Sequence, residues 1–85
     1  MKAEIREMII ARLQDRLRQF GIRHSELHGS FDLVQSGLVN SVEFVDLVAM
    51  IEESTGIEID YEKALEEGDF TTIGGIIRNF EKFTA

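Results

Sequence analysis

The stretch SGLVNSVEFVDLV, residues 36–48, joins a glycine-containing turn to an amphipathic acidic segment. Asn40 is a favourable N-cap residue, and Glu43 follows three residues later, which is the spacing of a capping box. The stretch therefore predicts a helix from Ser41 to about Thr55. Ser41 takes its first position, where backbone N–H groups lack helical partners and the helix dipole is positive. Capping chemistry alone requires nothing more of Ser41 than a place in the helix start.

Apolar residues recur with helical spacing in three segments of the chain. The three stripes are Ile5, Ile9, Leu13 and Leu17 with Met8 and Phe20 beside them; Phe44, Leu47, Val48 and Ile51; and Ile73, Ile76, Ile77, Phe80 and Phe83. Gly21 and Gly56 are stop signals for the first two helices, and Thr71 or Thr72 can cap the last. A short helix is expected over residues 61–67. We therefore predict an all-α fold, a single domain over residues 1–85 that forms a small antiparallel bundle of three main helices plus one short helix.

Two features of the chain need a packing explanation. The connection over residues 21–39 is long for a compact domain, and we expect it to cross the core with room for a short helical turn. Its apolar residues are Leu27, Phe31, Leu33, Val34 and Leu38. Gly74 and Gly75 each cost about 1 kcal/mol in a helix interior relative to alanine. Either close approach to a neighbouring helix or a simply weaker first turn accounts for them.

Size and charge favour a binding module over an enzyme. A chain of 85 residues builds one modest core and has little mass left for an active-site cleft. The net charge is −7; residues 1–28 carry six basic and four acidic groups, and the remainder carries three basic and twelve acidic groups. Such an acidic surface repels nucleic acid and attracts basic protein patches. The chain has no cysteine, no signal-peptide pattern and no apolar run of membrane-spanning length, so we expect a cytoplasmic protein without a membrane partner.

Catalytic and metal-binding patterns are weak. His24 and His28 have the spacing of helical metal ligands, but no third strong ligand accompanies them. The pairs Glu52-Glu53 and Glu66-Glu67 do not face each other on a helix, and no nucleophile elbow surrounds Ser41. We therefore expect no catalytic residue and no metal ligand, with a small hydrolase or metalloenzyme as a minor alternative.

The run from Ser36 to Glu53 resembles the signature of acyl carrier proteins and peptidyl carrier proteins. In that family a glycine-containing turn leads into an Asp-Ser-Leu triplet, which reads Asn40-Ser41-Val42 here. The residues VDLV at 45–48 and Glu52-Glu53 are similar to the family's acidic recognition helix. TGIEI at 55–59 resembles the exit from that helix, and FTTI at 70–73 resembles the start of the final helix. The likeness covers most of the chain.

The resemblance implies a covalent cofactor. Ser41, flanked by Asn40 and Val42, would carry 4′-phosphopantetheine, which a separate phosphopantetheinyl transferase takes from coenzyme A. An acyl, aminoacyl or peptidyl group would ride on the arm's thiol as a thioester, so the chain itself would catalyse nothing. Its partners would be a loading ligase and the downstream enzymes of fatty-acid, polyketide or nonribosomal-peptide synthesis, each meeting a monomer through a basic patch. Mapping onto the family places the following residues toward partners: Val42, Glu43, Val45, Asp46, Ala49, Glu52 and Glu53.

Two departures from the family pattern leave alternatives open. Asn40 replaces the usual aspartate and Val42 the usual leucine, which predicts slower loading, an unusual transferase, or a carrier relic that is never loaded. The turn over residues 36–39 is more similar to stand-alone aminoacyl or peptidyl carriers than to the main fatty-acid carriers. The alternative function is a helical interaction module that uses the same acidic face to bind a basic partner without any prosthetic group.

Overall fold

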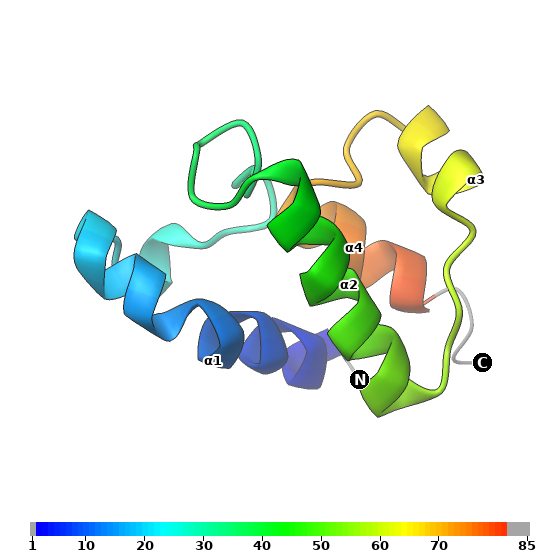
Figure 1. Cartoon of the computed structure of the whole chain (residues 1–85), viewed down its shortest axis with the longest axis horizontal. Helices are drawn as coiled ribbons and strands as arrows, with labels where there is room; N and C mark the ends of the chain where they lie inside the picture. The colour runs from blue at the N-terminus through cyan, green and yellow to red at the C-terminus, as the bar shows by residue number, and fades with distance from the viewer. Residues whose placement is uncertain (1, 82–85) are drawn as a thin grey trace.

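The computed structural model describes the backbone of residues 2–81 and the side chains of residues 4–81. Its elements are α1 (Lys2–Phe20), a 3-10 turn η1 (His24–Glu26), α2 (Ser41–Thr55), α3 (Tyr61–Glu66) and α4 (Ile73–Glu81) (Figure 1). α1 packs against both α2 and α4. No strand forms within the described residues, and a single isolated bridge joins Asp32 to Thr72. These elements confirm the predicted all-α bundle of three main helices and one short helix.

The core is built from the three predicted apolar stripes. Every stripe residue within the described side chains is buried, except that Met8 is partly buried and Phe20 is 51% exposed. The prediction for Phe20 is therefore wrong. The last turn of α1 extends past the other helices in Figure 1, and Gly21 turns the chain away at φ +69°, so no helix covers Phe20. Phe83 lies outside the described residues.

The connection between α1 and α2 crosses the core as predicted. Four of its side chains are buried: Leu27, Leu33, Leu38 and Val39. Its backbone also pairs with the start of α4, because the Ile73 N–H donates to Phe31 O at 3.0 Å and the Gly74 N–H donates to Gly29 O at 2.8 Å. The predicted helical turn in this connection is η1.

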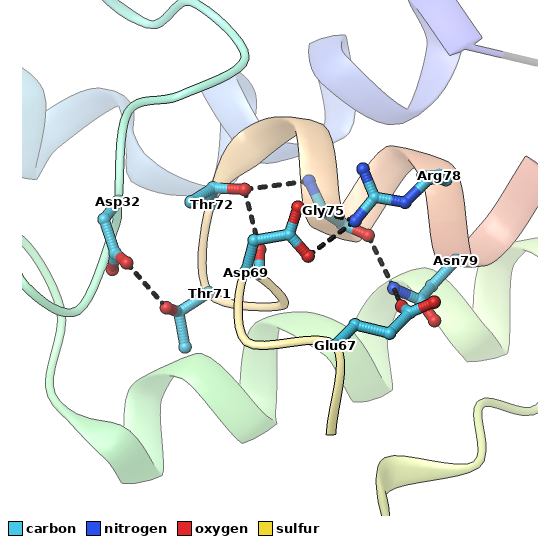
Figure 2. A network of polar contacts seen from close by, with 8 residues as sticks. All are labelled: Asp32, Glu67, Asp69, Thr71, Thr72, Gly75, Arg78 and Asn79. Atoms are coloured by element: carbon cyan, nitrogen blue, oxygen red, sulfur yellow. Dashed lines mark hydrogen bonds and ion pairs between the residues drawn. The ribbon is translucent and has the colours of Figure 1, made fainter. Parts of the chain in front are cut away.

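A polar network closes the start of α4 (Figure 2). The Thr72 hydroxyl accepts from the Gly75 N–H at 2.9 Å and donates to Asp69 O at 2.7 Å, so Thr72 is the capping residue. The neighbouring Thr71 hydroxyl donates instead to Asp32 Oδ2 at 2.8 Å, which ties the α1–α2 connection to this turn. Further along α4, the Asn79 side chain donates to Gly75 O at 2.7 Å.

The glycine pair of α4 permits close backbone contacts. A Cβ atom added at Gly75 would lie 1.9 Å from Asp69 O, and one at Gly74 would lie 2.9 Å from Gly29 O. Close approach therefore explains both glycines. The expected neighbour was a helix, and that detail is wrong: the neighbours are the turn before α4 and the α1–α2 connection, because these segments cross the first turn of α4.

Candidate functional site

Ser41 is the exposed first residue of α2. Asn40 Oδ1 accepts from the Glu43 N–H at 2.8 Å, and Glu43 Oε1 accepts from the Asn40 N–H at 2.9 Å. The predicted capping box is thus confirmed. Since Asn40 supplies the cap, the helix start does not require the Ser41 hydroxyl, and that hydroxyl makes no hydrogen bond among the described residues. An exposed hydroxyl group therefore lies at the positive end of an α-helix of 15 residues.

An arginine from α1 supports this turn. Arg16 Nη2 donates to Glu43 Oε2 at 2.7 Å, and Arg16 Nη1 donates to Glu43 Oε1 at 3.3 Å and to Leu38 O at 2.8 Å. The hydrogen bonds from Arg16, followed by the one from the Asn40 backbone, hold the pKa of Glu43 below its ordinary value. Sequence reasoning missed Arg16, because no local pattern relates a residue of α1 to one 27 positions away.

The carboxylates predicted to face partners fall into two groups. Asp46 and Glu53 are exposed and make no ion pair within the described part of the chain. Glu43 is held by Arg16, and Glu52 is partly buried, with its Oε2 accepting from the Ile59 N–H at 2.8 Å. Asp46 and Glu53 are therefore accessible on the surface of α2, whereas Glu43 and Glu52 form hydrogen bonds within the chain near the two ends of that helix.

The apolar residues predicted on this face are accessible. Val42 is 70% exposed and Val45 is 48% exposed, and Ala49 is also exposed. Exposed valines beside exposed carboxylates make a mixed apolar and acidic surface, which is suited to a protein partner. Ser41 lies at one end of this surface.

An apolar cavity of about 270 Å³ opens beside Ser41. Its lining comes from α2, α3 and the adjoining turns and comprises Val34, Ser41, Phe44, Val45, Tyr61, Leu65, Phe70 and Thr71. The Phe70 ring meets Phe44 edge-on at 5.2 Å and Tyr61 at 5.9 Å between ring centres. Burial, followed by the negative charge of Glu52, raises the pKa of Tyr61.

Sequence reasoning missed the contribution of α3 to this cavity. Leu65 is 60% exposed at its edge, next to the buried Ala64. Adjacent residues on a helix point in different directions, so one turn that buries Ala64 leaves Leu65 outside the core. The sequence therefore indicated that Ala64 and Leu65 do not both face the core, but it did not show which residues Leu65 contacts.

The two histidines and the glutamate pairs were weaker candidates for metal binding or catalysis. His24 lies exposed in η1, and His28 Nδ1 contacts Ser30 Oγ at 2.8 Å. No group of three or more His, Cys, Asp or Glu side chains within the described residues is arranged to hold a metal ion. In the second glutamate pair, Glu67 Oε1 accepts from Asn79 Nδ2 at 3.2 Å, across the turn between α3 and α4.

Comparisons of the chain with protein-family models, with curated proteins and with solved structures found no match in any of the three cases. Within residues 2–81, no helix combines the length and the apolar character needed to cross a membrane.

Proposed function

We propose that this protein is a stand-alone carrier that bears 4′-phosphopantetheine on Ser41 and presents acyl, aminoacyl or peptidyl cargo to partner enzymes. The observation that carries the proposal is the free, exposed Ser41 hydroxyl at the start of an acidic helix whose cap is supplied by another residue. The arm's thiol would supply the thioester chemistry that a chain without cysteine lacks.

Loading is a phosphoryl transfer performed by a separate transferase. The Ser41 Oγ would attack the pantetheine-bearing phosphorus of coenzyme A, and its proton would pass to a base on the transferase. A phosphoester bond forms, the pyrophosphate bond breaks, and 3′,5′-ADP leaves. The resulting anionic phosphodiester would lie at the N-terminus of α2, where the helix dipole favours a negative charge by about 0.3–1 kcal/mol.

The surroundings of Ser41 suit an attached arm. Because the Asn40–Glu43 capping box leaves the hydroxyl unused, modification breaks no hydrogen bond within the described residues. The apolar cavity bounded by Val45, Leu65 and Phe70 offers a surface for the apolar parts of an arm or its cargo.

Partner contact would use the mixed surface of α2. Asp46 and Glu53 would meet basic side chains, while Val42 and Val45 supply apolar contact area. An exposed ion pair contributes only about 0–1 kcal/mol. Contacts of this strength suit a carrier that must leave each enzyme after a single transfer.

The direct test is incubation of the purified chain with coenzyme A and a promiscuous phosphopantetheinyl transferase, followed by intact-mass analysis. We expect wild type to gain one phosphopantetheine group and Ser41→Ala to gain none. Ser54→Ala, which removes an exposed serine from the other end of α2, is the matched control and should load normally. No mass gain in wild type with several transferases would overturn the proposal.

The alternative is an interaction module without a prosthetic group, and the exposed Val42–Asp46–Glu53 surface favours it, since that surface exists without any modification. It predicts that Ser41→Ala keeps cellular function while Asp46→Lys with Glu53→Lys abolishes it. The carrier proposal predicts that both changes abolish function. A complementation assay with these variants separates the two.

A further inference from the structure

Arg16 binds the chain on both sides of Ser41. Its guanidinium donates to the Leu38 carbonyl, three residues before Ser41, and to both carboxylate oxygens of Glu43, two residues after it. The three distances are 2.8, 3.3 and 2.7 Å. The turn that carries Ser41 therefore cannot swing away from α1 without breaking a group of charge-assisted hydrogen bonds.

The contact with Glu43 also fixes the helix cap. Glu43 accepts the Asn40 N–H through Oε1, the same oxygen that accepts from Arg16 Nη1, while Oε2 accepts from Arg16 Nη2. Holding both oxygens selects one orientation of the carboxylate, and this orientation is the one that closes the capping box. Arginine is suited to this task because its planar fork of donors matches a carboxylate, whereas lysine offers a single point charge.

We propose that Arg16 is a positioning residue for the modification of Ser41. By joining Leu38 and Glu43 to α1, it holds the Ser41 hydroxyl in one place for the incoming transferase. This role rests on the proposed carrier function. In this role Glu43 binds Arg16 and closes the helix cap. The carboxylates of α2 that would contact partners are then Asp46 and Glu53.

Arg12 offers a matched control on the same helix. It lies one turn before Arg16 and lines the same groove between α1 and α2, together with Asp15 and Asp46. Arg12 makes no hydrogen bond to the Ser41 turn among the described residues. Arg12→Met and Arg16→Met remove the same charge from the same groove, but only Arg16→Met removes the three hydrogen bonds.

The experiment measures kcat/KM for loading by a phosphopantetheinyl transferase with coenzyme A, scaled to the folded fraction from circular dichroism. We expect Arg16→Met to lower kcat/KM about tenfold, since displacement of a reacting group by about 1 Å costs up to 10²-fold. Arg16→Lys should fall between this variant and wild type. Arg12→Met should load like wild type.

Amide hydrogen exchange supplies a readout that does not depend on loading. Arg16→Met should raise exchange of the Glu43 N–H and of its neighbours in residues 38–44 while leaving the middle of α1 and α2 protected. A merely destabilised fold would raise exchange throughout both helices. Glu43→Gln added to Arg16→Met should cause little further loss of loading, because the two side chains act as one unit.

The outcomes distinguish this role from the carrier function itself. A wild-type chain that gains no mass would overturn the carrier function and this role together. Normal loading of wild type and of Arg16→Met, with unchanged exchange in residues 38–44, would overturn the positioning role alone. A similar loss in Arg12→Met would show that charge in the groove, and not the hydrogen bonds of Arg16, sets the loading rate.

Discussion

The starts of α2 and α4 solve the same capping problem and differ in what they do with their hydroxyl groups. At α4, the Thr72 hydroxyl caps the helix and the Thr71 hydroxyl binds Asp32, so both are used (Figure 2). At α2, Asn40 caps the helix and the Ser41 hydroxyl is left exposed and without a hydrogen bond among the described residues. The hydroxyl groups at the start of α4 are thus used within the fold, whereas the Ser41 hydroxyl at the start of α2 is accessible to another molecule.

The largest expected effect on stability is at the start of α4. Gly75→Ala should lower the free energy of unfolding by about 3 kcal/mol or more, the upper range for overpacked sites, because the added Cβ would overlap Asp69 O. Gly74→Ala, where the nearest atom would lie at 2.9 Å, should cost less. Chemical denaturation measures both. Equal stability of Gly75→Ala and wild type would show that the turn before α4 relaxes freely.

Loss of either N-cap should lower the free energy of unfolding by a similar amount. Thr72→Ala and Asn40→Ala should each lower the free energy of unfolding by about 1 kcal/mol, the typical value for a lost N-cap. Thr72→Ser and Asn40→Asp keep a capping oxygen and should stay close to wild type. A stable Asn40→Ala would imply that α2 takes its cap from Ser41 instead, which would remove the contrast between the two helix starts.

The contribution of the α2 start to folding stability should also depend on pH in the acid range. Because Arg16 and the Asn40 N–H hold the pKa of folded Glu43 below its ordinary value of 4.5, this group stabilises the fold above that pH. The stabilisation is lost as pH falls from 4.5 through the folded pKa. Arg12, Asp15 and Asp46 line the same groove. In Arg16→Met the pKa of Glu43, followed by NMR of its carboxyl carbon, should rise toward 4.5; an unchanged value would contradict the assigned contact.

The smallest effect on stability is expected at Ser41. Ser41→Ala should change the free energy of unfolding by no more than about 0.5 kcal/mol, as for an exposed side chain without a structural contact. Thermal unfolding of Ser41→Ala, measured beside Thr72→Ala and Asn40→Ala, compares the three losses of stability. A loss equal to that of Asn40→Ala would mean that the hydroxyl has a structural task, and its exposure would then no longer argue for modification.

The local parts of this architecture follow directly from sequence. The Asn40–Glu43 spacing predicts the start of α2, and the stripe Phe44, Leu47, Val48 and Ile51 predicts its buried face, because capping and helical periodicity involve residues within a few positions. The predicted bounds of α2 and α3, the end of α1 before Gly21 and the start of α4 after Thr72 are confirmed to within a residue.

The tertiary parts do not follow from sequence. Arg16 meets Glu43 across 27 residues, and Gly75 faces Asp69 through a turn whose path no periodicity specifies. Phe20 fits the stripe of α1, yet it lies where that helix has passed its partners. The resemblance likewise assigned Glu43 and Glu52 to a partner surface, whereas their hydrogen bonds within the chain become visible only once the fold brings the acceptors and donors together.

Localising the modification tests the central claim most directly. Wild-type chain loaded by a phosphopantetheinyl transferase is digested, and fragmentation of the modified peptide identifies the residue that carries the group. We predict one group, on Ser41 alone, with Thr71 and Thr72 unmodified. A group found on any residue other than Ser41, or no group after treatment with several transferases, would contradict the account.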